Sequence, residues 1–294
     1  MGRGGNDFMR VYFLVTADEY PEAAQAPQNG RDFKNFAYAA YQIGENSALS
    51  RGNIPLQTRG GLICVSDRDA PAVNQPDSLG AAITRECGRR GCTGAILDFE
   101  QPPREDLWTL TALLSRQARE TRRKLYIPRS YADAAPDAVR FINTAVSGGN
   151  FREYLQEEIA NAKGADRVAL DIQRLRMDFR LPAPDGEGEI LNPEQFQTLS
   201  DGKAVFFSPD LCARYFTFTE QIPARSVPDD QIPGEKTYYA QTGAAHFVLF
   251  DDADTINTKL KIGAELGIDT AFLLWSEIRE FIGDLRWSFN PHNY

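Results

Sequence analysis

The chain has 294 residues, enough for one large domain with a core that needs no disulfide or metal. Its formal net charge of −9 argues against binding to the phosphate backbone of nucleic acids. The four cysteines and two histidines do not have the spacing of a structural zinc site. The N-terminal residues lack the apolar core of a signal peptide, and no apolar run has the length of a membrane span. We therefore expect a cytoplasmic protein that binds neither nucleic acid nor membrane.

Extended apolar segments alternate with helical patterns along the chain, as in parallel α/β folds. Strands are predicted at residues 10–16, 35–43, 60–66, 93–100, 124–131, 167–173, 203–208 and 269–278. Helices are predicted at residues 78–90, after Pro103, and at 135–146, 151–163 and 255–266. No Gly-x-Gly-x-x-Gly follows the first strand, which argues against a dinucleotide-binding fold. Eight strands with helices between them predict a single (β/α)8 TIM-barrel domain over residues 1–294.

Two turn-rich segments interrupt this alternation in the C-terminal half. Residues 181–195 form a stretch rich in proline, glycine and acids, and residues 226–245 follow an aromatic-rich segment. Such composition is typical of loops and turns. We expect a small loop or hairpin insertion here, with Thr242 and Gly243 at its turn.

The segment GCTGAILDFEQPP, residues 91–103, places two acids at the end of an apolar strand. Successive side chains of a strand alternate between its faces, so Asp98 and Glu100 share one face with Ile96. The opposite face carries only Ala95, Leu97 and Phe99. This pattern predicts a half-buried strand whose carboxylates point into a defined site.

Two segments resemble glycoside hydrolase family 18, the chitinase-like barrels. TGAILDFE (93–100) is similar to the fourth-strand pattern Asp-Gly-x-Asp-x-Asp-x-Glu, and HFVLFDDADTINTKLKIGAELGIDTAFLLW (246–275) is similar to the closing unit of that family. In this unit an acidic turn precedes a helix, a bend and a strand that ends in Trp. The branch found in spore-forming bacteria, which acts on spore peptidoglycan, is the most similar one.

The resemblance implies a substrate, a mechanism and roles for three residues. Glu100 falls on the general acid, Asp98 on the acid that orients the substrate's N-acetyl group, and Trp275 on the floor of the sugar subsite. The substrate's own N-acetyl carbonyl would be the nucleophile, giving a retaining reaction without a cofactor. The partner would be an N-acetylglucosamine-containing glycan of the peptidoglycan or chitin type. Association with spores would reconcile such a glycan with the absence of a signal peptide.

Four further residues are candidates for binding the glycan. Asp171 and Gln173 have inward parity on the strand predicted at 167–173. Tyr131 is the last residue of the strand predicted at 124–131 and could stack on a sugar, and Glu277 lies two residues after Trp275.

The sequence also departs from the family pattern. Thr93 and Ile96 stand where the motif has its first two aspartates, ALDIQ replaces a Tyr-Asp pair on the sixth strand, and Ser66-Asp67 replaces Ser-x-Gly-Gly on the third. These differences favour a second interpretation, in which the barrel has lost catalysis and serves as a glycan-binding or structural protein.

The two acids, Asp98 and Glu100, are also compatible with roles outside sugar chemistry. They could form structural ion pairs with Arg129 or Arg174, or, together with Asp171, hold a divalent cation. The sequence does not determine the sugar linkage, the role of the two turn-rich segments or the oligomeric state.

Overall fold

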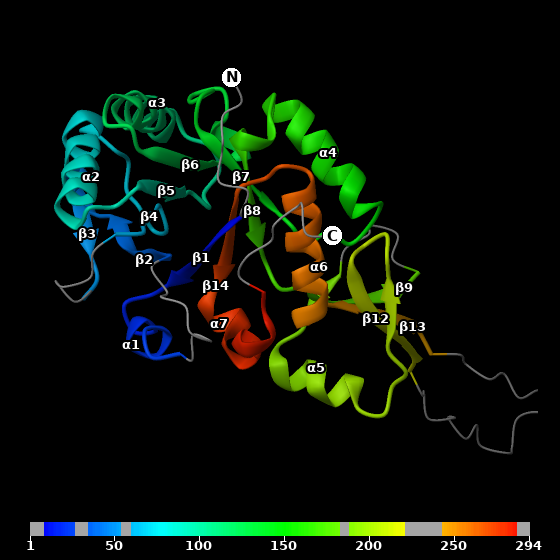
Figure 1. The fold of residues 1–294 in the computed structure, drawn as a ribbon. Helices are drawn as coiled ribbons and strands as arrows, with labels where there is room; N and C mark the ends of the chain where they lie inside the picture. Colours follow the sequence, from blue (N-terminus) through cyan, green and yellow to red (C-terminus); the bar gives the residue numbers. More distant parts are fainter. Residues whose placement is uncertain (1–8, 27–34, 54–59, 183–187, 221–242, 287–294) are drawn as a thin grey trace, which may run out of the picture. The chain divides into compact units, whose positions relative to one another are not determined.

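The computed structural model of the chain describes residues 9–26, 35–53, 60–182, 188–220 and 243–286. The chain divides into two compact units, one formed by residues 1–174 and 253–294 and the other by residues 175–252. The first unit is a barrel, and the second is an antiparallel sheet with one helix (Figure 1).

Eight parallel strands close the barrel of the first unit. In chain order they are β1 (Arg10–Val15), β2 (Phe36–Ile43), β4 (Leu62–Ser66), β5 (Gly94–Asp98), β6 (Lys124–Pro128), β7 (Val139–Asn143), β8 (Val168–Ile172) and β14 (Thr270–Leu274). The sheet closes where β1 pairs in parallel with both β2 and β14. A short strand, β3 (Leu49–Arg51), adds antiparallel to β2. The predicted (β/α)8 barrel is therefore confirmed.

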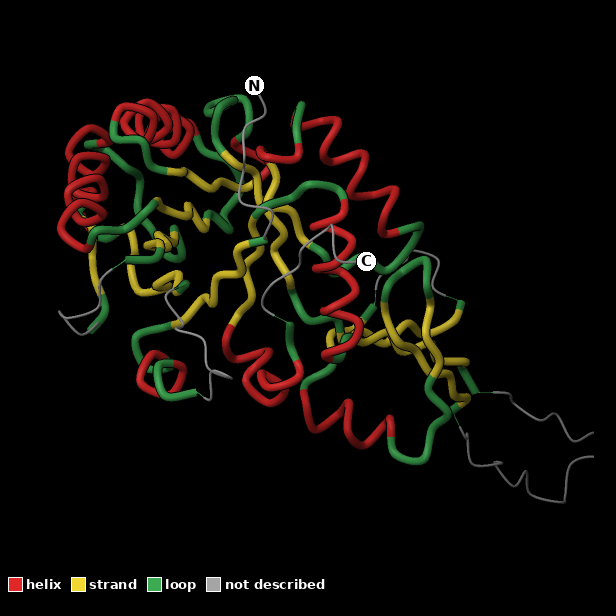
Figure 2. Tube along the Cα trace, in the orientation of Figure 1, coloured by secondary structure: helices red, strands yellow, loops and turns green. Residues whose placement is uncertain are grey.

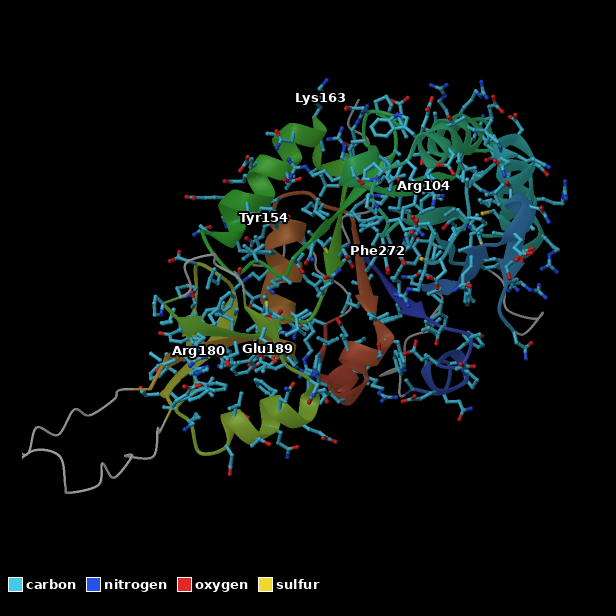
Figure 3. The ribbon with its side chains drawn as sticks, turned by 180° about the vertical axis from the view of Figure 1, so that it is seen from behind. Arg104, Tyr154, Lys163, Arg180, Glu189 and Phe272 are labelled. Carbon is cyan, nitrogen blue, oxygen red and sulfur yellow. The ribbon has the colours of Figure 1, made fainter. Side chains whose placement is uncertain are left out.

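The interior of the barrel is filled by apolar side chains that alternate along the strands. They are Tyr12, Ala37, Leu62, Cys64, Ile96, Tyr126, Val139, Ala169 and Phe272. Phe272, labelled in Figure 3, packs edge to face on Tyr126 with ring centroids 5.0 Å apart. This layer is a packed core rather than a channel, as in other barrels of this size.

Helices surround the strands of the barrel unit (Figure 2). The longer ones are α2 (Pro76–Arg90), α3 (Glu105–Glu120), α4 (Phe151–Ala162) and α6 (Ala253–Glu265), and the shorter ones are α1 (Tyr20–Ala23) and α7 (Trp275–Ile278). Local chemistry sets their ends: Gly91 ends α2 with a left-handed φ of 64°, and the Asn150 side chain caps α4 by accepting from the Arg152 and Glu153 amides. In the part of the chain that the structure describes, no helix has the length and apolar character needed to cross a membrane.

One predicted helix and one predicted barrel strand are wrong. Residues 135–146 contain strand β7 instead of a helix, because Val139 and Phe141 alternate into the barrel core while Ile142 packs on the other side. Residues 203–208 contribute β11 (Phe206–Ser208) to the sheet of the second unit, not to the barrel.

The second unit contains a five-stranded antiparallel sheet in the order β10-β9-β13-β12-β11. Its elements are β9 (Arg176–Leu181), β10 (Glu189–Ile190), α5 (Pro193–Ser200), β11, β12 (Ala213–Thr219) and β13 (Ala245–Phe250). A separate small core contains Leu191, Phe216, Val248 and Phe250. The insertion is therefore larger than the expected hairpin and has its own core. Most of the expected hairpin, including Thr242 at its turn, lies outside the described residues.

Candidate active site

Two acids lie on the inner face of the barrel, at the C-terminal ends of two strands. Asp98 is the last residue of β5, two positions after the core residue Ile96. Asp171 lies on β8, two positions after the core residue Ala169. Because side chains alternate along a strand, both carboxyl groups point into the mouth of the barrel. This end of a barrel is where active sites of this fold are found.

Asp171 is held by neighbouring amide side chains. Gln173 Nε2 donates to Asp171 Oδ2 at 2.9 Å, and Asn143 Nδ2 donates to Gln173 Oε1 at 2.8 Å. The pKa of Asp171 is raised to about 7, chiefly by burial and in part by the negative charges of Asp98 and Glu277, while the hydrogen bond from Gln173 opposes the rise. The carboxyl group of Asp171 is thus held in its predicted inward orientation by hydrogen bonds that run from Asn143 through Gln173.

Asp98 also has a raised pKa, of about 6. Burial is the largest cause, followed by the negative charges of Glu100 and Asp67, while the positive charge of Arg68 opposes them. The pKa of the buried Cys64 thiol is raised by burial and, to a smaller extent, by the negative charges of Asp98, Asp171 and Glu100.

Glu100 lies beyond the end of β5, and its side chain is 52% exposed. Both of its carboxylate oxygens accept from Arg68 Nη2 at 3.3 Å. The expected structural ion pair is therefore present at Glu100, but with a different arginine. Arg129 pairs instead with Glu158, and Arg174 pairs with Glu280.

Two predicted sugar-binding aromatic residues are buried in the barrel unit. Trp275 is 1% exposed and packs edge to face on Phe13, with ring centroids 6.3 Å apart. Tyr131 is 0% exposed and packs on Phe99 and Trp108. Phe13 alternates with the core residue Tyr12 and so lies on the helix-packed side of β1, and Trp108 lies on helix α3. Their contacts favour a role in the core.

Glu277, on α7, does reach the mouth. Its Oε2 accepts the backbone amide of Arg174 at 2.8 Å, and its charge contributes to the raised pKa of Asp171. The structure therefore brings together Asp98, Asp171 and Glu277 with the more exposed Glu100, whereas Trp275 and Tyr131 are buried.

Sequence reasoning did not assign a role to Asp67. This residue follows β4 directly, is 0% exposed, and accepts the backbone amide of Glu100 at 2.8 Å. In the sequence, Asp67 directly follows the strand that pairs with β5, and this position could have identified it as a residue of the barrel mouth. It adds a further negative charge beside the acid pair.

The arrangement of the acids suits proton transfer more than metal binding. Two carboxyl groups with pKa values near neutral can each exchange a proton at physiological pH. Within the described residues, no group of three or more histidine, cysteine, aspartate or glutamate side chains has a geometry that could hold a metal ion.

Comparison with solved structures identifies the architecture. The barrel resembles the spore cortex-lytic enzyme SleL of Bacillus cereus, with 13% identity and a TM-score of 0.59 over 96% of this chain and 72% of that one. It also resembles a GH18 chitinase of Cycas revoluta solved with (GlcNAc)3, with 12% identity and a TM-score of 0.53 over 90% and 94% of the two chains. No protein-family model and no curated protein sequence matches the chain. At these identities the likeness establishes the fold, a GH18-like TIM barrel.

Proposed function

We propose that the barrel mouth binds an N-acetylglucosamine-containing glycan and hydrolyses it by a substrate-assisted, retaining mechanism. The observation that carries this proposal is the position of Asp98, a partly buried carboxyl with a pKa of about 6, beside Glu100 at the C-terminal end of β5. The likeness to barrels of chitinases and spore cortex-lytic enzymes supports a glycan of the chitin or peptidoglycan type.

The two acids divide the chemistry between them. Glu100 donates a proton to the glycosidic oxygen while the carbonyl oxygen of the substrate's N-acetyl group attacks the anomeric carbon. The leaving sugar departs with that proton, and an oxazolinium ion forms. Asp98 accepts a hydrogen bond from the N-acetyl N–H and stabilises the developing positive charge. Water then attacks the anomeric carbon and breaks its bond to the acetyl oxygen, which opens the oxazolinium ring, and Glu100 takes up a proton from this water.

The direct test replaces the proton donor and compares a matched exposed glutamate. Glu100→Gln is expected to lower kcat/KM for a chromogenic chitobioside or for peptidoglycan by about 10²-fold or more, because a general acid contributes that much. Glu120→Gln is the control: Glu120 is exposed at the C-terminal end of α3, away from the mouth, and its loss is expected to leave turnover unchanged.

A second candidate is a glycan-binding barrel without catalysis. Three observations favour it: Glu100 is paired with Arg68, Trp275 is buried, and Ile96 is apolar. Calorimetry with N-acetylglucosamine oligomers separates the two. Binding without any turnover by the wild type supports this second candidate, and the absence of both binding and turnover refutes both.

A further inference from the structure

Asp67 is a buried carboxylate whose oxygens are used by the backbone that follows β5. Asp67 Oδ1 accepts the Glu100 amide at 2.8 Å, and Oδ2 accepts the Gln101 amide at 3.3 Å. Asp67 itself is 0% exposed. Burying a carboxylate costs free energy unless hydrogen bonds compensate the lost hydration. The two amide bonds supply this compensation and join the loop after β4 to the loop after β5.

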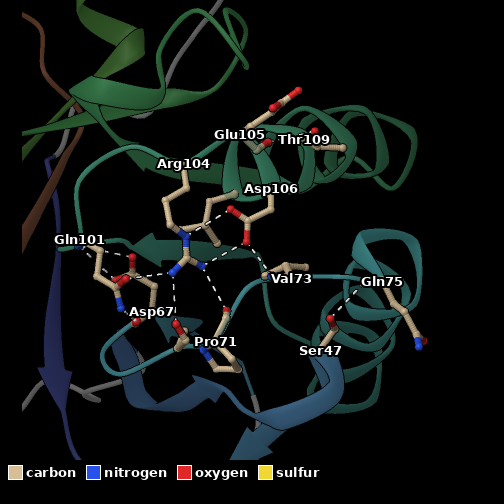
Figure 4. A network of polar contacts seen from close by, with 12 residues as sticks. Ser47, Asp67, Pro71, Val73, Gln75, Gln101, Arg104, Glu105, Asp106 and Thr109 are labelled. Carbon is tan, nitrogen blue, oxygen red and sulfur yellow. Dashed lines mark hydrogen bonds and ion pairs between the residues drawn. The ribbon is translucent and has the colours of Figure 1, made fainter.

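A further set of contacts fixes the same loops (Figure 4). Gln101 Nε2 donates to the Asp67 carbonyl oxygen at 2.5 Å, and Arg104 Nη1 donates to Gln101 Oε1 at 2.9 Å. Arg104 also forms an ion pair with Asp106 at 3.1 Å, and Asp106 accepts the Val73 amide at 2.6 Å. The loops after β4 and β5 are therefore joined through one continuous polar network.

Asp67 also supplies an acid next to Asp98 from the neighbouring strand. Ser66, which precedes it, is in register with Asp98, and the Asp67 amide donates to the Asp98 carbonyl oxygen at 3.4 Å. On β5 itself, the residue two positions before Asp98 on the same face is the apolar Ile96. The charge of Asp67 is one of the causes of the raised Asp98 pKa.

We propose that Asp67 is a positioning residue of the active site, which holds the backbone of Glu100 in place and supplies the negative charge beside Asp98. This inference rests on the proposed function, since it assigns Asp67 a role in the same reaction. Misplacing a reacting group by about 1 Å can cost about 10²-fold in rate, so the hold on Glu100 matters for kcat rather than for substrate affinity.

The test compares Asp67→Asn with Asp69→Asn. Both variants remove one negative charge from the same loop, but Asp69 is exposed and has a φ of 58°, which asparagine adopts readily. With Asp67→Asn, we expect kcat to fall by about tenfold or more with KM within about twofold. With Asp69→Asn, both constants should stay within about twofold.

Two NMR measurements report on the same role without turnover. In Asp67→Asn, the Asp98 carboxyl pKa should fall, because a neighbouring negative charge is lost. Asparagine keeps only one acceptor oxygen, so one of the Glu100 and Gln101 amides loses its acceptor and should exchange with solvent about tenfold faster. Unchanged Asp98 pKa and amide exchange in a folded Asp67→Asn protein would overturn the inference, as would unchanged kcat beside an active wild type.

The two proposals fail in different ways. A wild type without turnover refutes the proposed hydrolysis, and the hold of Asp67 on Glu100 is then decided by the NMR measurements alone. If Asp67→Asn does not fold, amide exchange in the wild type replaces it, because the Glu100 and Gln101 amides donate to the buried Asp67 carboxylate. Exchange of these two amides at least about tenfold slower than that of an unprotected amide supports the inference, and exchange at the unprotected rate overturns it.

Discussion

Replacing Asp171 with asparagine should stabilise the protein at alkaline pH and leave its stability unchanged in acid. Burial at the barrel mouth raises the pKa of this carboxyl from 3.8 to about 7. At 1.36 kcal/mol per pKa unit, the ionised form is disfavoured in the folded state by about 4 kcal/mol. The site is partly accessible, which reduces this figure, so we expect about 2–4 kcal/mol. Asparagine keeps an oxygen that can accept from Gln173 Nε2.

The sign follows from proton binding in the two states. Below pH 3.8, Asp171 is protonated whether the chain is folded or unfolded, so it contributes no pH dependence. Between pH 3.8 and about 7 the unfolded carboxyl is ionised while the folded one keeps its proton, so the free energy of unfolding falls as the pH rises. Above pH 7 the whole penalty is present. The variant removes this penalty.

The assay is urea denaturation of both proteins at pH 4 and pH 8. The gain in unfolding free energy of Asp171→Asn over the wild type should be near zero at the lower pH and about 2–4 kcal/mol at the higher one. Asp133→Asn, at an exposed position of the barrel unit, should change stability by less than about 0.5 kcal/mol at both. An equal effect of Asp171→Asn at the two pH values would refute the reasoning.

Two further substitutions test the neighbourhood of the acids and the core. Arg68→Ala removes an exposed ion pair and should cost less than about 1 kcal/mol in unfolding free energy. Because the Arg68 charge lowers the Asp98 pKa, its removal should raise that pKa above about 6 in an NMR titration, and a fall would contradict the assignment of causes. Trp275→Ala should cost about 3–5 kcal/mol in urea denaturation, because the indole is 1% exposed. A loss below about 1 kcal/mol would argue against its place in the core.

The sequence predicted the barrel and the inward acids because both depend on local periodicity. Alternation along β5 and β8 correctly assigned Asp98 and Asp171 to the inner face, beside Ile96 and Ala169. Strand β7 was missed because its few residues are bracketed by alanines and a proline that also suit a helix, and only the closed sheet selects the extended form.

Other features of the site lie beyond the reach of strand periodicity. Strand β5 ends at Asp98, so alternation gives no orientation for Glu100. Trp275 follows the end of β14, and its position was carried over from the family pattern, although alternation from Phe272 would have placed it on the outer side. The contacts of Asp67 join two loops 33 residues apart in the chain, and no local pattern predicts them.

The acids lie at the mouth of the barrel and not in its middle layer, because only at the strand ends are backbone amides available to donate to carboxylates. In the middle layer, Ile96 is 3% exposed and surrounded by apolar side chains, and the amides of its strand are committed to the sheet. A carboxylate there would be desolvated without compensating donors. At the mouth the strands end, and the freed amides of Glu100 and Gln101 satisfy Asp67. Asp98 and Asp171 keep partial access to solvent at this end. Proton transfer at this site would therefore exchange protons with solvent at the mouth, because the apolar layer below provides no path through the barrel.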